Sequence, residues 1–341
     1  MKKIFIVDDN DANLLLAKNA LDGMYETYAL PSAARMFKLL EKITPDLILL
    51  DVDMPEMDGF EAMQKLKENE RLKTIPVIFL TAKQDTESEI QGFEMGAIDF
   101  ITKPFSPPVL LKRIKTHIEV DKLIKESQRD LRETHDATIN VVADMVENRD
   151  QMTGGHIERT KIYLKILIDE LVRTGLYKDE MTDWDISLLL PSAQLHDVGK
   201  IGISDLILNK PGKLTDEEFE LIKKHCSEGE RIIDKIIGKT KNNKFLNHAR
   251  KFAVYHHEKW DGTGYPRGLA GEDIPLEGRI MVIADVYDAL VSERPYKKPF
   301  THKEAVEIIK NESGTHFDPK IVEAFLNVAD DFLVELTSMR R

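Results

Sequence analysis

The stretch Asp46-Leu47-Ile48-Leu49-Leu50-Asp51 decides the fold of the first part of this 341-residue chain. Its four consecutive apolar residues show no polar alternation, which is typical of a β-strand covered on both faces. Similar short apolar runs occupy residues 3–7, 27–30, 77–80 and 99–102, and helix-length stretches such as 13–21, 33–41 and 59–69 lie between them. Strands that alternate with helices predict an α/β domain with a doubly wound, five-stranded parallel sheet.

Polar side chains follow the ends of these strands, where open parallel sheets bind their ligands. Asp8 and Asp9 end the first strand, and Asp51, Thr81 and Lys103 end the third, fourth and fifth. Three carboxylates at one edge repel one another unless a divalent cation lies between them, and oxygen ligands favour Mg²⁺. Asp51 is then a candidate nucleophile for a phosphoryl group, with Mg²⁺ and Lys103 neutralising the charge. Each residue alone is more often a helix cap or a solvated group, but the five together favour a site.

The first 120 residues resemble a response-regulator receiver domain. The residues that carry the resemblance are Asp8-Asp9, Asp51, Met54-Pro55, Asp58-Gly59, Thr81-Ala82 and Lys103-Pro104. The resemblance implies a flavodoxin-like fold, phosphoryl transfer from a histidine kinase to Asp51, and Mg²⁺ held by Asp8 and Asp9. It also implies that Thr81 and Phe100 move together as a switch.

Composition narrows the classes of function. Lys+Arg 48 against Asp+Glu 60 gives a net charge of −12, and such a field repels nucleic-acid polymers and anionic membranes. The chain has a single cysteine, Cys226, which excludes an intramolecular disulfide. It has no run of 18 apolar residues, so no membrane span is predicted. We therefore expect a cytoplasmic protein of two domains.

A helical connector is predicted between the domains, because residues 109–148 contain neither Pro nor Gly and are rich in charge. Apolar residues recur there at a loose spacing of three and four, at Leu110, Ile114, Ile124, Leu131, Val142 and Met145. This pattern is typical of a helix that pairs as a coiled coil, so we expect a homodimer. A solvated single helix docked on either domain is the alternative. We place the domains at 1–120 and 141–341, with the linker at 121–140.

The second half has a helical pattern, with expected helices at 157–174, 185–195, 216–238, 249–257 and 275–292. Histidines and carboxylates recur near the helix ends, at His156, His196, Asp197, His225, His256, His257 and Asp285. The adjacent His256 and His257 project about 100° apart on a helix, so both reach one metal only near the helix end. Asp197 can bridge two ions through its two oxygens. Imidazole and carboxylate without thiolate favour Fe, Mn or Zn.

A lone buried histidine is more often a core residue with a satisfied ring than a ligand. We interpret the remaining histidines in that way, namely His117, His135, His248, His302 and His316. The doublets His196-Asp197 and His256-His257 do not fit this interpretation, because two adjacent side chains cannot both lie on one apolar face.

Residues 140–330 resemble an HD-GYP domain, an all-α fold. The residues that carry the resemblance are 147–150, 153–156, His196-Asp197-Val198-Gly199-Lys200, 210–215, His225, His256-His257-Glu258, Gly264-Tyr265-Pro266, 284–290, 294–297 and 317–319. The resemblance implies a metal-dependent phosphodiesterase that hydrolyses cyclic diguanylate to the linear dinucleotide pGpG, to GMP, or to both. Together with the receiver domain, the resemblance implies an enzyme whose activity is controlled by phosphorylation of Asp51.

The resemblance also assigns roles to residues. His156, His196, Asp197 and Asp285 would hold one metal, and Asp197, His225, His256 and His257 the other. The catalytic residues it implies are Lys200, Asp197 and Asp288, with Asp150 supporting them. The substrate contacts it implies are Tyr265, Arg294, Tyr296 and Lys297.

Two departures from the family pattern affect the prediction. Met152 occupies the position at which some members have a Glu that serves a third metal, so we predict two metals, Fe or Mn first and Zn as the alternative. Ser204 replaces the usual Pro in a nearby loop. Two alternatives are a catalytically weak sensor or adaptor that binds cyclic diguanylate, and a hydrolase whose substrate is another cyclic dinucleotide or a nucleotide phosphomonoester.

Overall fold

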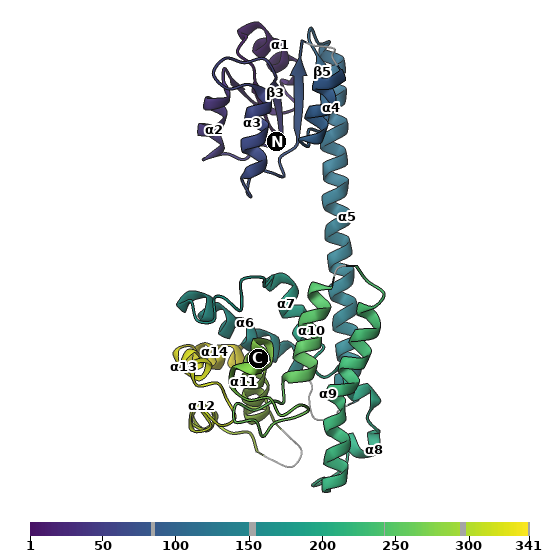
Figure 1. Cartoon of the computed structure of the whole chain (residues 1–341), viewed down its shortest axis with the longest axis vertical. Helices are drawn as coiled ribbons and strands as arrows, with labels where there is room; N and C mark the ends of the chain where they lie inside the picture. Colours follow the sequence, from purple (N-terminus) through teal and green to yellow (C-terminus); the bar gives the residue numbers. More distant parts are fainter. Residues whose placement is uncertain (83–85, 150–154, 242, 294–297, 340–341) are drawn as a thin grey trace. The chain divides into compact units, whose positions relative to one another are not determined.

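A computed structural model describes the chain except for residues 83–85, 150–154, 242, 294–297 and 340–341. The chain divides into two compact units, Met1–Leu131 and Arg132–Arg341 (Figure 1). Within the described parts of the chain, no helix combines the length and the apolar character needed to cross a bilayer.

The first unit contains a five-stranded sheet in the order β2-β1-β3-β4-β5, and every neighbouring pair is parallel. The strands are β1 (Lys3–Val7), β2 (Glu26–Leu30), β3 (Leu47–Asp51), β4 (Val77–Thr81) and β5 (Asp99–Thr102). The predicted doubly wound parallel sheet is confirmed, and each strand lies within one residue of its predicted range.

Helices cover both faces of this sheet, namely α1 (Asp11–Leu21), α2 (Ala33–Leu40), α3 (Gly59–Glu68), α4 (Thr86–Glu94) and the beginning of α5 (Pro107–Glu147). Ile48 and Leu50 of β3 belong to one apolar cluster, whereas Leu47 and Leu49 belong to another. All four side chains are fully buried. The uninterrupted apolar run therefore reflects a strand that packs against helices on both sides.

Helix α5 continues without a break from the first unit into the second. Its bounds lie within two residues of the predicted helix at each end. Apolar side chains on it are exposed, including Leu123 at 63%, Leu131 at 71% and Met145 at 65%. Pairing of this helix with a second copy remains a prediction.

The second unit is helical, as predicted. Its elements are α6 (His156–Thr174), α7 (Ile186–Ala193), the 3-10 helix η1 (Val198–Gly202), α8 (Asp205–Leu208), α9 (Asp216–Ile237), α10 (Lys244–Tyr255), the 3-10 helix η2 (Gly271–Asp273), α11 (Leu276–Val291), α12 (His302–Asn311), α13 (Pro319–Asn327) and α14 (Ala329–Met339). Helix α10 differs from its prediction at both ends, because it begins at Lys244 and ends at Tyr255. His256 and His257 thus follow the helix, which meets the condition for both to reach one ion.

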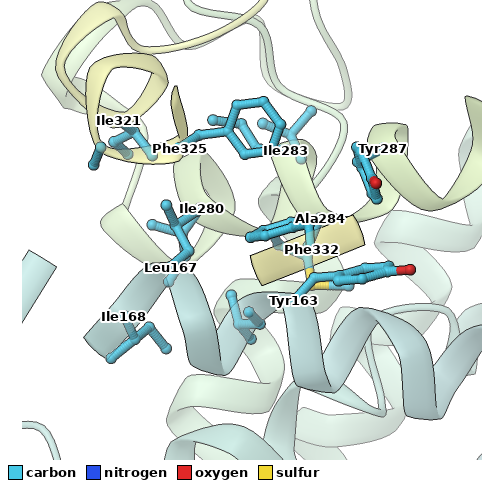
Figure 2. Close-up of a cluster of buried hydrophobic side chains, with 14 of the residues drawn as sticks. Tyr163, Leu167, Ile168, Ile280, Ile283, Ala284, Tyr287, Ile321, Phe325 and Phe332 are labelled. Carbon is cyan, nitrogen blue, oxygen red and sulfur yellow. The ribbon is translucent and has the colours of Figure 1, made fainter. Parts of the chain in front are cut away.

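An aromatic core joins the helices that carry the site (Figure 2). Tyr163 of α6 stacks on Phe332 of α14 at 4.8 Å between ring centroids, and Tyr287 of α11 packs edge-on against both rings. All three side chains are fully buried. Burial of each large apolar side chain contributes roughly 1.5–3 kcal/mol, so α6 and α11 are held firmly against each other.

Candidate functional site

The carboxylates at the strand ends of the first unit gather at one edge of its sheet. Carboxylate oxygens of Asp8, Asp9 and Asp51 lie within 4.8 Å of one another. Lys103 Nζ lies 2.8 Å from Asp8 Oδ2 and 2.6 Å from Asp51 Oδ1. Asn13 Nδ2 donates to both oxygens of Asp8 at 3.1 Å. The cluster holds three carboxylates against one ammonium, and this excess of negative charge suits a divalent cation.

The neighbours of Asp51 match the predicted switch positions. Burial raises the pKa of Asp51, against the opposing effect of the hydrogen bond from Lys103. Thr81 is 2% exposed at the end of β4, the strand next to Asp51. Phe100 on β5 is also buried, and its ring packs against Phe79 at 5.2 Å and Phe93 at 5.1 Å. Phosphorylation at Asp51 and the switch role of Thr81 and Phe100 remain predictions.

In the second unit, the predicted ligands form two groups. The first ligand group is His156 of α6, His196 after α7 and Asp285 of α11, and its ligand atoms lie within 4.8 Å of one another. His156 Nε2 is 3.4 Å from both His196 Nε2 and Asp285 Oδ1. His156 and His196 are buried and Asp285 is partly buried.

The second ligand group is His225 of α9 with His256 and His257 after α10, whose ligand atoms also lie within 4.8 Å of one another. His225 Nε2 lies 3.3 Å from His256 Nε2. Two ring nitrogens in each group thus face each other at hydrogen-bond distance or slightly more. Such pairs of acceptors are stable only with a cation or a proton between them.

Asp197 lies between the two groups. Its Oδ2 is 3.4 Å from His196 Nε2, and its Oδ1 is 3.5 Å from His225 Nε2. Oδ1 is buried and accepts no hydrogen bond from the described residues. A buried carboxylate oxygen without a donor is costly, and a metal ion shared with either group would satisfy it. The donor set therefore fits two divalent metal ions bridged by Asp197.

Backbone carbonyls orient three of the imidazoles. The Nδ1 atoms of His196, His225 and His256 donate to the carbonyls of Ala193, Ile222 and Phe252 at 2.9, 2.7 and 2.8 Å. A carbonyl only accepts, so Nδ1 carries the proton and Nε2 presents its lone pair.

Most of these rings are held neutral. Burial lowers the pKa of His225 and His256, and it lowers the pKa of His257 to about 3. At His196 burial also favours the neutral ring, but the neighbouring Asp197 outweighs it and raises the pKa. A metal ion beside Asp197 would take the place of that proton.

Asp288 lies beside His156 of the first ligand group. Its Oδ2 accepts from His156 Nδ1 at 2.8 Å, and Arg159 donates to Oδ1 from Nε at 2.6 Å and to Oδ2 from Nη2 at 3.0 Å. Both oxygens are thus occupied on the side of His156 away from the ligand groups. This arrangement suits Asp288 to fixing the tautomer of His156, and its catalytic role remains a prediction. Arg159 was not anticipated, because nothing in the local sequence links it to a residue 129 positions away.

Lys200 lies beside the bridging carboxylate. Its Nζ is 2.7 Å from Asp197 Oδ2. Burial would raise the pKa of Asp197, but Lys200 and His196 outweigh it and hold the pKa well below its usual range. Asp197 is thus ionised, and the Lys200 ammonium lies next to it.

The loop with the Gly-Tyr-Pro motif packs on the second ligand group. Tyr265 stacks on His257 at 4.7 Å between centroids. Glu258, only 2% exposed, accepts from the backbone N–H groups of Arg267 and Leu269 at 2.7 and 3.0 Å and so fixes the path of the loop. A Cβ on Gly264 would come 2.3 Å from the backbone nitrogen of Lys259. The motif therefore needs glycine there for steric reasons.

Two residues at the start of α9 extend this aromatic surface and were missed in the sequence. The Phe219 ring, 44% exposed, meets Tyr265 edge-on at 6.3 Å. Lys223 Nζ lies 4.9 Å from the Phe219 centroid and 5.6 Å from that of Tyr265. Their spacing of four residues, about one helical turn, on the helix that also carries His225 was the signal that could have identified them.

Several predicted residues lie outside the described part of the chain. Asp150, Met152, Arg294, Tyr296 and Lys297 belong to this set, so the two-metal prediction based on Met152 and three of the substrate contacts remain predictions. The five histidines interpreted as ordinary residues have partners away from the ligand groups: Asp99 for His117, Phe245 for His135, Glu277 for His248, Tyr287 for His302 and Glu312 for His316.

Comparisons with known proteins match both units. The family model described as the response regulator receiver domain matches residues 4–115, and that of the HD domain matches residues 140–321. A probable cyclic di-GMP phosphodiesterase of Vibrio cholerae is 41% identical over 97% of this chain and 78% of its own length. The cyclic di-GMP phosphodiesterase response regulator RpfG of Xanthomonas campestris is 32% identical over 95% of this chain and 86% of its own. The 3'3'-cGAMP-specific phosphodiesterase 2 of Vibrio cholerae is 39% identical over 62% of this chain and 38% of its own.

Proposed function

The chain belongs to the family of response regulators that join an N-terminal receiver domain to a C-terminal HD-GYP domain, and on that basis we propose that it is a metal-dependent phosphodiesterase that hydrolyses cyclic diguanylate under the control of Asp51. The observation that carries the proposal is the position of Asp197, whose oxygens face one ligand group each.

The metal complement we propose is two divalent ions, Fe or Mn, with Zn as the alternative. The first ligand group with Asp197 would hold one ion, and the second ligand group with Asp197 the other. When bound, such a pair supplies Lewis-acid stabilisation of the phosphate and a nucleophile from water at neutral pH.

The chain's own residues would bind and orient the substrate. Lys200 places an ammonium next to Asp197, where it would stabilise phosphate charge or protonate the leaving oxygen. Tyr265 offers an aromatic face beside His257 for a guanine base. Arg294 and Lys297 are the proposed phosphate contacts, since Arg offers a bidentate fork.

Product analysis on protein of known metal content tests this proposal. Protein loaded with Fe, Mn or Zn is incubated with cyclic diguanylate, and pGpG and GMP are separated by chromatography. The His196→Ala/Asp197→Ala variant is the control and should form no product. Tight binding of cyclic diguanylate without any product, with both Fe and Mn, would favour a sensor or adaptor instead.

Control by the receiver domain forms the second part of the proposal. A histidine kinase would phosphorylate Asp51, with Asp8 and Asp9 holding Mg²⁺ and Lys103 neutralising charge. The hydrolysis rates of the phosphorylated protein and of Asp51→Ala are compared. Equal rates would contradict control through this residue.

A homodimer through α5 is the third part. The exposed Leu123, Leu131 and Met145 supply apolar side chains for a coiled coil. We expect a dimer by sedimentation, and a monomer for Leu131→Glu. A wild-type monomer at micromolar concentration would contradict it.

A different cyclic dinucleotide is the second candidate substrate. The similarity to a relative named as specific for 3'3'-cGAMP favours including it. The ratio of kcat/KM for the two dinucleotides, measured on one metal-loaded preparation, decides between them.

A further inference from the structure

A single arginine holds the segment that carries Lys200. Arg149 follows the last residue of α5 by two positions. Its Nη1 donates to the carbonyls of Lys200 and Ile201 at 3.3 and 2.8 Å, and its Nη2 to that of Ile203 at 3.0 Å. Its Nε and Nη2 also donate to Asp205 Oδ1 at 3.2 and 2.7 Å.

The backbone of Arg149 is also bound by the segment that its side chain contacts. Asn209 Nδ2 donates to the carbonyl of Arg149 at 2.8 Å. Arg149 is therefore held through both its backbone carbonyl and its guanidinium. A planar group with five fixed donors is suited to reading several carbonyls at once, which a lysine ammonium is not.

Arg149 acts at the C-terminal end of η1, where the carbonyl of Lys200 also accepts from the backbone N–H of Ile203 at 3.0 Å. Val198 and Gly199 at its beginning are buried, but Ile201 is 55% exposed. The Lys200 end of η1 thus has less apolar packing to hold it than the Asp197 end. The 2.7 Å approach of Lys200 Nζ to Asp197 Oδ2 depends on where this end lies.

The last turn of α5 also reaches the first ligand group. Glu147 Oε1 accepts from the backbone N–H of His156 at 2.7 Å. A cavity beside the ligands is lined by Val146 and Glu147 together with His156, Asp197 and Lys200. The end of α5 therefore contacts the beginning of α6 at His156 and lines the same cavity as Asp197 and Lys200.

We propose that Arg149 is the positioning residue that sets Lys200 against Asp197, and that the residues at and just after the end of α5 thereby set the rate of phosphodiester hydrolysis. This proposal rests on the proposed function for the reaction itself. Arg149 does not contact the substrate or the metals and acts through Lys200. Its removal should therefore lower kcat and leave KM and metal content nearly unchanged.

A double-mutant cycle tests the link between the two residues. Arg149→Ala should lower kcat at least tenfold in the wild-type background and less than twofold in the Lys200→Ala background. Arg149→Lys should resemble Arg149→Ala, because a single ammonium nitrogen lacks the planar fork whose two terminal nitrogens reach the carbonyls of Ile201 and Ile203. Arg231→Ala, which removes an exposed arginine on α9 that pairs with Glu228, is the matched control and should keep the wild-type rate. Multiplicative losses in the two backgrounds would overturn the proposal.

Hydrogen exchange of the metal-free protein gives a readout that needs no turnover. Arg149→Ala should speed exchange at least tenfold for amides of residues 200–205 and leave those of α11 unchanged. Unchanged exchange at residues 200–205 would overturn the proposal, and equal acceleration in α11 would indicate general destabilisation and overturn it as well. A wild-type protein without activity on cyclic diguanylate would refute the proposed function alone, because exchange is measured without substrate.

Discussion

Gly199→Ala should be among the most damaging single-methyl changes in the second unit. A Cβ at Gly199 would lie 1.8 Å from the carbonyl oxygen of His225 and 2.5 Å from the backbone nitrogen of Gly229. Both are backbone atoms of α9, so no side chain can rotate away. Helix η1 thus runs in direct backbone contact with α9 next to a proposed ligand.

The size of the effect follows from this geometry. Real Cβ contacts essentially never fall below 3.0 Å, so η1 and α9 must separate by about 1.2 Å, the difference between 3.0 and 1.8 Å. Metal–ligand distances tolerate only about 0.2 Å, and a displacement of about 1 Å at a reacting group costs about 100-fold in rate. That rate loss corresponds to about 2.7 kcal/mol. Overpacking of this kind lowers the free energy of unfolding by about 1–3 kcal/mol.

Gly202→Ala is the matched control, because it adds the same methyl to the same 3-10 helix. There the nearest atom is Glu228 Cγ at 3.5 Å, an ordinary contact. Metal content per chain, kcat/KM with cyclic diguanylate and urea unfolding are measured for both variants. We expect Gly202→Ala to match the wild type and Gly199→Ala to lose metal and at least 100-fold in kcat/KM. Equal behaviour of the two variants would refute the steric argument.

Three further changes have distinct expected outcomes. Asp285→Asn should leave one metal per chain and Asp197→Asn none, because Asp197 is the one carboxylate among the described residues whose oxygens face both ligand groups; equal metal content of the two variants by mass spectrometry would contradict the proposed bridge. Phe219→Ala should raise KM for cyclic diguanylate several-fold but not for a small phosphodiester without bases, and a parallel rise for both would indicate a structural role. The pKa of buried Glu277 is lowered, since its hydrogen bonds with His248 and Lys251 outweigh burial. Its ionised form thus adds stability above about pH 4.3, and this stability is lost as the pH falls through the lower folded-state pKa. The urea concentration at half-unfolding, measured from pH 3 to 7, should therefore fall less steeply toward acid pH in Glu277→Gln than in the wild type.

The sequence was most informative where function coincides with a rule of local structure. Asp51, Thr81 and Lys103 were placed at one edge because strands end there and parallel strands end together. The strand bounds follow from apolar runs that two helical layers bury. In the second unit, the grouping of His196 with Asp197 and of His256 with His257 followed from adjacency, since neighbouring residues cannot share one apolar face.

Contacts between residues far apart in the sequence could not be predicted from local sequence patterns. Asp288 is predicted to be catalytic, but the sequence did not indicate its partner Arg159, which lies 129 residues earlier. Arg149 donates to carbonyls 51 to 54 positions away. Every residue has a backbone carbonyl, so the residue types do not indicate which carbonyls accept these hydrogen bonds. Phe219 reads as an ordinary apolar residue of α9 until the loop carrying Tyr265 is seen to fold back on it.

These long-range contacts converge on η1. Gly199 sets its distance from α9, Arg149 holds its far end, and Asp197 immediately before it faces both ligand groups. A shift of this segment therefore changes the bridging carboxylate and the Lys200 ammonium together, whereas a shift of α11 moves Asp285 in one group alone. If the proposed control by the receiver domain acts through the end of α5, a shift of η1 would change Asp197 and Lys200 together without any change in the aromatic core between α6 and α11.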